Sequence, residues 1–382
     1  MISERRQPAQ SKPGDRTRFN ETRCAIQTRG ETSDIGEGPI SAGLEAEVIP
    51  MLPVIPRAKG PTARSKRWGV ILAGGDGARL RSLTRFICGD NRPKQFCPLF
   101  DECTLLGNTV RRAERSIPAA QTLFALTHAH RDFYDDELDG FQSQRIVQPA
   151  NKGTTPPILF SALSIAKMDE DALMAVLPSD HYYSDEAGFT AALESAFEIA
   201  AKRTESVVLL GAPPSDPEVE YGWIELGASA ADGSTELLAV RCFWEKPSLE
   251  IAEALLHKHS AWNTFVMVGR VRAFLEMVAQ AIPDVLEALR RARLWTGSET
   301  RIDDSVYDQV LSSDFSRHVL SVEISRLLVL RVRDLGWSDL GHPGRVLAVL
   351  EKHNSKPRWM KAWKQAERAA ADASPQANPA VA

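Results

Sequence analysis

Short apolar runs alternate with amphipathic segments between about residue 67 and residue 360. A brief apolar run bounded by turn residues is typical of a strand that is buried on both faces. Such runs predict strands over 68–72, 122–127, 145–148, 173–177, 207–210 and 327–332. Apolar positions three and four residues apart predict helices over 104–117, 184–203, 249–257, 271–282, 284–294 and 346–353. The alternation predicts an α/β fold, with a mostly parallel sheet covered by helices on both faces.

The two ends of the chain lack this pattern. Residues 1–66 are rich in Arg, Glu, Gln, Ser, Gly and Pro without sustained periodicity, so we expect a disordered arm. Residues 361–382 are rich in Ala, with prolines near the end, and we expect a disordered tail. A translation start at Met51 is an open alternative for the arm. Residues 67–360 are then expected to form a single domain.

Charge and composition narrow the class of protein. With 46 Lys and Arg against 50 Asp and Glu, the formal net charge is −4. A nucleic-acid or anionic-membrane binder would be dominated by clustered positive charge, so neither partner is expected. The five cysteines form no C-x-x-C pair, which argues against a zinc site or redox motif. No apolar stretch approaches about eighteen residues, and the start lacks the apolar part of a signal peptide. We therefore expect a cytoplasmic protein.

A glycine-rich segment follows the first predicted strand. Gly74, Gly75 and Gly77 lack side chains, so backbone N–H groups there can close around phosphate oxygens, and Arg79 adds a cation. Lys94, held after a proline, could neutralise a phosphoryl group that is being transferred. The segment has neither the third glycine of a dinucleotide-binding turn nor the G-K-[ST] of a P-loop. This argues against a dehydrogenase and a P-loop NTPase, although an ordinary turn is an alternative.

Two carboxylates follow predicted strands. Asp180 lies in Leu177-Pro178-Ser179-Asp180-His181, and Asp339 lies in a Gly-Trp-Ser-Asp-Leu-Gly segment. Mg²⁺ takes one or two protein oxygens and fills its octahedron with water and substrate phosphates. The pair therefore predicts a Mg²⁺ site, while a helix cap is the alternative for either residue. For His181 we favour packing and hydrogen bonding over metal binding.

Polar residues in three further segments could contact a ligand. Gln148 can pair with a base edge, and Gly153 allows close backbone approach. Glu245 beside Lys246 suits a sugar hydroxyl and its phosphate. Asn263 could read another hydroxyl. The alternatives are a loop before a helix, an exposed ion pair and a core position, respectively.

The order of these segments resembles the sugar-1-phosphate nucleotidyltransferases, and most closely the mannose-1-phosphate guanylyltransferases. The matching segments are LAGGDGARL (72–80), RPKQF (92–96), QPANKGTTPPI (148–158), VLPSDH (176–181), YGWI (221–224), EKP (245–247), WN (262–263) and GWSDLG (336–341). They cover roughly residues 68–353. The resemblance implies a Rossmann-like domain that joins a nucleoside triphosphate, GTP above all, to a sugar 1-phosphate and releases pyrophosphate.

The resemblance also implies a role for individual residues. Those implied to bind the nucleotide are Leu72, Gly74, Gly75, Gly77, Gln148 and Gly153. Those implied to act on the phosphates in catalysis are Arg79 and Lys94, with Asp180 and Asp339 holding Mg²⁺. Those implied to bind the sugar phosphate are Gly222, Glu245, Lys246 and Asn263.

Departures from the family pattern keep other functions open. Lys94 follows Arg79 by 94 − 79 = 15 positions, a longer gap than usual, and Phe265 stands where the family often has glycine. The alternatives are the same reaction with UTP or dTTP and glucose 1-phosphate, or a catalytically silent regulator that binds nucleotide sugars. Because the chain ends soon after the last motif, we expect a monofunctional enzyme. A homo-oligomer remains possible.

Overall fold

The computed structural model describes residues 66–373 except 142, 231–235 and 292–298. All described residues belong to one structural unit, Pro56–Ala382. The predicted disordered arm, apart from Lys66, lies outside the described residues, as do residues 374–382 of the predicted tail.

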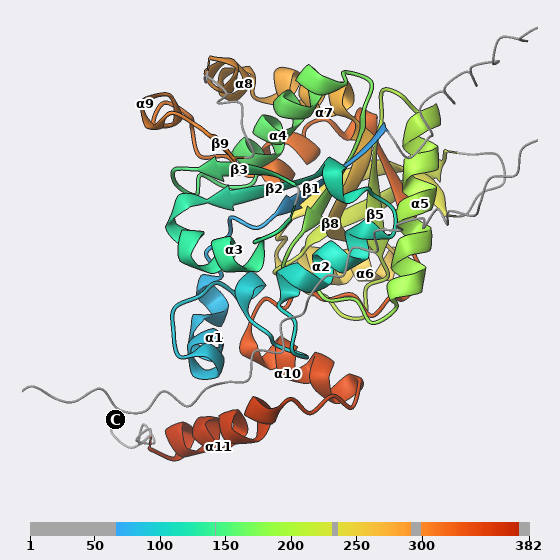
Figure 1. Ribbon diagram of the computed structural model, residues 1–382. Helices are drawn as coiled ribbons and strands as arrows, with labels where there is room; N and C mark the ends of the chain where they lie inside the picture. The colour runs from blue at the N-terminus through green and yellow to red at the C-terminus, as the bar shows by residue number, and fades with distance from the viewer. Residues whose placement is uncertain (1–65, 142, 231–235, 292–298, 374–382) are drawn as a thin grey trace, which may run out of the picture. The chain divides into compact units, whose positions relative to one another are not determined.

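A mixed sheet forms the centre of this unit (Figure 1). In the described part of the chain it has ten strands in the order β5-β10-β7-β6-β8-β4-β1-β2-β3-β9. Their bounds are β1 Arg67–Leu72, β2 Thr122–Thr127, β3 Gln144–Gln148, β4 Leu173–Pro178, β5 Val207–Ala212, β6 Gly222–Ser229, β7 Leu237–Glu245, β8 Ala261–Arg270, β9 Glu299–Arg301 and β10 Leu327–Arg331.

The predicted parallel arrangement holds for one half of the sheet. Strands β4, β1, β2, β3 and β9 pair in parallel, as do β10 and β5. Strands β6, β7 and β8 pair antiparallel with one another in the order β7-β6-β8, and β8 continues antiparallel onto β4. Antiparallel neighbours need no crossover helix between them. Strands β6, β7 and β8 therefore do not follow the strand–helix alternation from which the parallel sheet was predicted.

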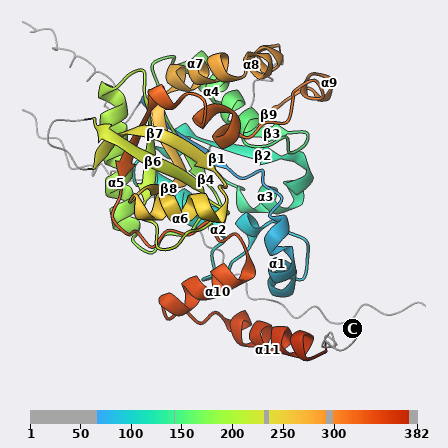
Figure 2. The same ribbon diagram turned by 180° about the vertical axis from the view of Figure 1, so that it is seen from behind.

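Helices cover both faces of the sheet (Figures 1 and 2). The side of β1 and β4 that carries Val70 and Met174 joins α4 and α7 in the largest apolar cluster, while α2 and α5 contact β1, β4, β5 and β8. The helices are α1 Arg81–Cys88, α2 Leu105–Glu114, α3 Arg131–Glu137, α4 Thr155–Met168, α5 Glu186–Lys202, α6 Leu249–His257, α7 Val271–Ala281, α8 Pro283–Arg290, α9 Asp304–Tyr307, α10 Pro343–Lys352 and α11 Arg358–Ala373.

The predicted helices and strands are found, with ends shifted by a few residues. Two of the helix starts are fixed by side-chain caps. The Thr104 hydroxyl accepts from the N–H of Gly107 at 2.9 Å before α2, and Asp185 accepts from Gly188 at 2.8 Å before α5. The helix expected over 284–294 ends at Arg290, and part of its predicted span lies outside the described residues.

The expected disorder from residue 361 is wrong as far as residue 373, because helix α11 occupies Arg358–Ala373. Its first turns carry large apolar side chains on one face. Met360 is buried in a cluster with Leu83 of α1, and the rings of Trp363 and Phe86 meet edge to face at 5.2 Å. The Trp359 indole N–H donates to the carbonyl of Leu99 at 3.1 Å. Burial of these side chains offsets the entropic cost of ordering the segment, a cost that the Ala-rich composition alone suggested would keep it disordered.

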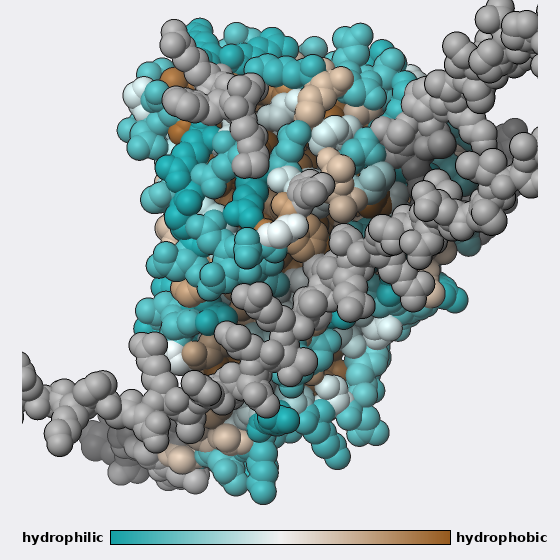
Figure 3. Space-filling view, in the orientation of Figure 1, coloured by the Kyte–Doolittle hydropathy of each residue, from teal (hydrophilic) through white to brown (hydrophobic). Residues whose placement is uncertain are grey.

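The surface seen in Figure 3 is largely hydrophilic, with apolar residues scattered between charged ones. Among the helices that the structure describes, none combines the length and apolar character needed to cross a membrane.

Candidate active site

A cleft of about 270 Å³ opens where several strands end. Seven of the residues singled out in the sequence line it: Leu72, Gly75, Asp180, Gly222, Glu245, Asn263 and Asp339. Leu72 ends β1 and is paired in register with Pro178 at the end of β4, so the glycine-rich segment and Asp180 leave the sheet side by side. Parallel strands bring their carboxyl ends to one edge, which is where α/β proteins bind ligands.

Gln95 holds the glycine-rich segment in place. Its side-chain amide N–H₂ donates to the carbonyls of Ala73 at 3.0 Å and Gly75 at 2.7 Å. Gly77 has φ of 57°, and a Cβ there would lie 2.9 Å from the backbone nitrogen of Lys94. Glycine is therefore required at position 77 both by its left-handed backbone and by this close approach.

Lys94 connects the two predicted metal-binding residues. Its side chain is largely buried, and its ammonium group lies 3.2 Å from Oδ2 of Asp180. The same nitrogen donates to the backbone carbonyl of Asp339 at 2.5 Å. A fixed cation thus lies between the two segments that carry these carboxylates, although Lys94 itself is not among the residues that line the cleft.

Asp339 is surrounded by partners that favour its ionised form. Its Oδ1 accepts from the Tyr221 hydroxyl at 3.1 Å and from the Arg345 guanidinium, which also bridges to Glu218. Burial raises the pKa of Asp339, but the charges of Arg345 and Lys94 outweigh it and hold that pKa below its ordinary value. Asp339 is therefore a carboxylate at neutral pH.

Asp180 and Asp339 fit the donor chemistry of Mg²⁺, since both are carboxylates that line one cleft. Within the described ranges, no group of three or more His, Cys, Asp or Glu side chains gathers around a possible metal position. His181 has the role we favoured for it. Its Nδ1 accepts from the indole N–H of Trp337 at 3.2 Å, and burial lowers the pKa of its imidazole.

Gly222, Glu245 and Asn263 also line this cleft and lie close to one another. A Cβ on Gly222 would lie 3.0 Å from Oε2 of Glu245 and 3.4 Å from Cβ of Asn263, so a side chain there would crowd both. The Asn263 carbonyl oxygen accepts from the N–H of Phe265 at 3.1 Å. Burial, together with the neighbouring charge of Asp314, raises the pKa of Glu245 to about 7.

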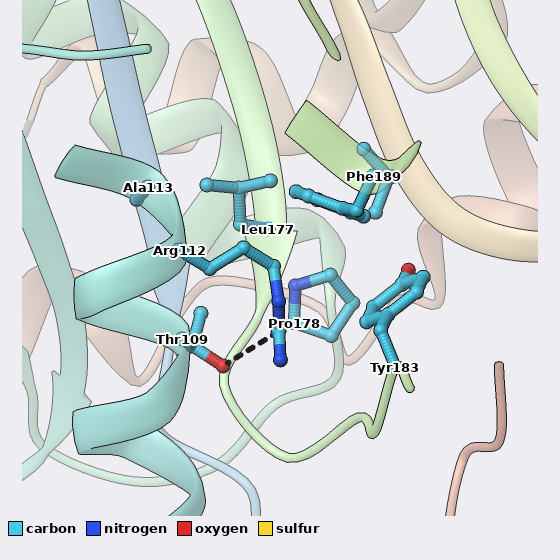
Figure 4. A pocket seen from close by; sticks show the side chains of 8 residues that line it. Thr109, Arg112, Ala113, Leu177, Pro178, Tyr183 and Phe189 are labelled. Carbon is cyan, nitrogen blue, oxygen red and sulfur yellow. Dashed lines mark hydrogen bonds between the residues drawn. The ribbon is translucent and has the colours of Figure 1, made fainter. Parts of the chain in front are cut away.

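Arg112 packs against the end of β4 and the segment that follows it and carries Asp180 (Figure 4). The guanidinium of Arg112, on α2, lies 4.7 Å from the ring centroid of Tyr183 on that loop. It also forms an ion pair with Glu186 at 2.8 Å. A buried Arg112 thereby ties α2 and the start of α5 to the loop that carries Asp180.

Other predicted nucleotide-binding residues do not line the cleft. The Gln148 side chain is buried and its carbonyl oxygen accepts from the Tyr307 hydroxyl at 2.9 Å. Gly153 has φ of 88°, and a Cβ there would lie 2.4 Å from the carbonyl oxygen of Ser313, which explains the glycine structurally. Gly74 and Gly77 belong to the same segment as Gly75 but are not among the lining residues.

Arg79 and Lys246 lie at the margins. Arg79 is exposed and pairs with Glu220 at 2.5 Å, while its second terminal nitrogen lies 3.9 Å from Oδ2 of Asp339. Lys246 is exposed and is not among the lining residues.

Sequence reasoning missed Gln95 and Arg345. Gln95 stands next to Lys94 in a segment that had been singled out, so its position was a usable signal. Arg345 follows Asp339 by six positions in a stretch that carried no signal, since the helix was expected to begin only at residue 346. The helix α10 begins at Pro343 and thus turns Arg345 toward Asp339.

Comparisons with known proteins place the chain in a family. A family model described as nucleotidyl transferase matches residues 68–355. The xanthan biosynthesis protein XanB of Xanthomonas campestris pv. campestris (strain B100) is 32% identical over 292 residues, which are 74% of this chain and 59% of that protein. The mannose-1-phosphate guanylyltransferase of Escherichia coli (strain K12) is 30% identical over 290 residues, covering 73% of this chain and 59% of the relative.

A solved structure agrees. A protein of Thermus thermophilus, described as mannose-1-phosphate geranyltransferase, superposes with a TM-score of 0.63 at 29% identity, covering 74% of this chain and 79% of its own. The chain spans 59% of the length of the first curated relatives that it matches. The family model alone covers well over half of the chain, so the resemblance to sugar-1-phosphate nucleotidyltransferases is confirmed and the chain belongs to the nucleotidyl transferase family.

Proposed function

We propose that the chain transfers GMP from GTP to mannose 1-phosphate, with Mg²⁺, giving GDP-mannose and pyrophosphate. The observation that carries this proposal is one cleft lined by Asp180, Asp339, Glu245 and Asn263, in which the segments of the first two are both contacted by Lys94. Lys94 and the two aspartates suit phosphates with Mg²⁺, and Glu245 and Asn263 suit sugar hydroxyls. The choice of GTP and mannose 1-phosphate rests on the activity named for the relatives.

The chemistry is an in-line displacement at the α-phosphorus of the nucleotide. A phosphate oxygen of the sugar 1-phosphate forms a bond to this phosphorus, and the bond to the bridging oxygen of the β-phosphate breaks. The attacking oxygen is already ionised, so no proton acceptor is needed. Catalysis of this kind consists mainly of positioning the reactants and neutralising charge.

The chain supplies groups for the phosphates. Backbone N–H groups of the segment that Gln95 holds would bind triphosphate oxygens, and Arg79 at the rim would add a cation. Lys94 would neutralise charge that develops on the α-phosphate, because its ammonium group is fixed before the substrate arrives. Asp180 and Asp339 would hold Mg²⁺, which when bound supplies further neutralisation of the triphosphate.

The chain also supplies groups for the sugar. With its pKa raised to about 7, Glu245 is partly protonated near neutral pH and can donate as well as accept a hydrogen bond. Asn263 is held by Phe265, and Gly222 leaves room beside both side chains. Glu245 and Asn263 can therefore form hydrogen bonds with hydroxyl groups of the sugar.

The proposal is tested by a matrix of substrates. Purified protein with Mg²⁺ is incubated with GTP, UTP, dTTP, ATP or CTP, each combined with mannose 1-phosphate or glucose 1-phosphate, and pyrophosphate release is measured. Fast release is expected with GTP plus mannose 1-phosphate. Fast release with another pair would contradict the proposed substrates, and no release from protein shown to be folded would contradict the activity.

A further inference from the structure

Two cysteines that belong to no C-x-x-C motif lie close together beside the candidate active site. The sulfur atoms of Cys88 and Cys97 lie 3.4 Å apart. Cys88 is the last residue of α1, and Cys97 directly follows the single helical turn Lys94–Phe96. The segment between the two sulfurs therefore contains Lys94 and Gln95, the residues that hold Asp339 and the glycine-rich segment.

The two thiols have unequal surroundings. Cys97 is fully buried in the apolar cluster that includes Leu83, whereas Cys88 is half-buried at the edge of that cluster. The intervening segment is folded tightly, because Arg92 pairs with Asp90 at 2.7 Å and donates to the carbonyl of Phe96 at 3.3 Å. These contacts of the intervening segment keep the two sulfur atoms close together.

The unequal surroundings give each thiol a different part in disulfide exchange. The hydrogen bond from Cys97 lowers the pKa of Cys88, and the charge of Arg92 lowers it further. The hydrogen bond to Cys88, together with burial, raises the pKa of Cys97. A half-buried thiol of lowered pKa is the better attacking group, and its buried neighbour is in place to complete the exchange.

We infer that Cys88 and Cys97 are a redox modification site that forms a reversible intramolecular disulfide and thereby displaces Lys94. The oxidant is a small-molecule disulfide such as oxidised glutathione. The Cys88 thiolate attacks one of its sulfurs and expels one glutathione thiolate. Cys97 then passes its proton to the released glutathione thiolate, and its sulfur attacks the Cys88 sulfur and expels the second glutathione as a thiolate, which takes a proton from water. Two protein thiols are oxidised to one disulfide, and one oxidised glutathione is reduced to two thiols.

Disulfide formation reaches the active site through the backbone. The sulfurs must approach from 3.4 Å to about 2 Å. Cys97 is fixed in the core and Cys88 ends a helix, so the approach moves the segment between them. A misplacement of about 1 Å can cost about a hundredfold in rate. The oxidised protein is therefore expected to lose at least about tenfold in turnover and to recover it on reduction.

The experiment uses the full chain and oxidised glutathione. Peptide mapping by mass spectrometry is expected to find a bond between Cys88 and Cys97, and dithiothreitol is expected to remove it. Hydrogen exchange is expected to change in the peptide that carries Lys94. Pyrophosphate release is expected to fall and recover in parallel. Cys88→Ser should abolish all three responses while leaving the reduced activity unchanged, and Cys242→Ser, at another half-buried cysteine, should respond as the wild type does.

The outcomes separate this inference from the proposed function, on which only its activity readout rests. Failure to find a Cys88–Cys97 bond would overturn the inference, and so would a mapped bond with unchanged hydrogen exchange around Lys94. A mapped bond with changed exchange, in a protein that releases no pyrophosphate even when reduced, would support the inference and contradict the proposed function.

Discussion

Asp339 is the residue on which the electrostatics of the cleft converge. Arg345, Tyr221 and the nearby Lys94 together keep its carboxylate charged despite burial. Such an arrangement is costly unless the charge has a task or a partner. In this structure Arg345 is the partner of the Asp339 carboxylate, and in the proposed function the same carboxylate binds Mg²⁺.

Asp339→Asn is therefore expected to lower turnover at least about a hundredfold, by analogy with the loss of a key electrostatic group. The apparent affinity for Mg²⁺ should fall with it, because a neutral amide is a weaker ligand. Steady-state pyrophosphate release at several Mg²⁺ concentrations measures both effects. Asp284→Asn, at an exposed position on α8, is the control, and near-normal turnover of Asp339→Asn would remove this carboxylate from the mechanism.

Glu245 predicts a pH dependence of stability. Its pKa is about 7 in the folded protein against 4.5 ordinarily, so the folded state binds the proton more tightly than the unfolded state does. This stabilisation is complete below pH 4.5 and is lost as pH rises through about 7. Relative to Glu245→Gln, the wild type should lose roughly 3 kcal/mol of unfolding free energy across that range. Urea unfolding of both proteins measures it, and parallel pH profiles would show that Glu245 is not perturbed.

Helix α11 shows that local composition does not reveal whether a segment docks on a distant part of the chain. Its Ala-rich sequence favours a solvated segment, but Met360 and Trp363 recur at a spacing that places them on one face against α1. Whether such a face is buried depends on a partner far away in the sequence. That partner, Phe86 with its neighbours, could not be identified from the residues of α11 alone.

Met360→Ala should accordingly destabilise the protein by about 2 kcal/mol through the lost burial and the cavity left behind. Lys361→Ala, one position along on the exposed face, should change stability by less than about 0.5 kcal/mol. Thermal and urea unfolding of the pair are the measurements. Equal stabilities of the two variants would show that α11 does not dock.

At the scale of the whole molecule, the cleft joins residues from distant parts of the chain. The proximity of Asp180 to the glycine-rich segment was predictable, because β1 and β4 pair in parallel and end in register. The meeting of Gly222, Glu245 and Asn263 was not predictable from pattern, since they come together through antiparallel strands that the alternation of strands and helices does not reveal. Those residues were found only through the family resemblance and isolated polar chemistry. Gln148 shows a further limit of pattern, because this polar residue at the end of a strand is buried and accepts a hydrogen bond from Tyr307, while its contact with a base stays a prediction.

In the proposed function, the ammonium group of Lys94 between the Asp180 and Asp339 segments accelerates nucleotidyl transfer. The most direct measurement is single-turnover formation of nucleotide sugar by Lys94→Gln, with GTP, mannose 1-phosphate and Mg²⁺ at saturation. Lys202→Gln, at an exposed position on α5, serves as the matched control. We expect at least about a hundredfold slower formation by Lys94→Gln in a folded protein, and an unchanged rate for the control. Formation of the nucleotide sugar by Lys94→Gln at the wild-type rate would show that Lys94 does not act in the transfer.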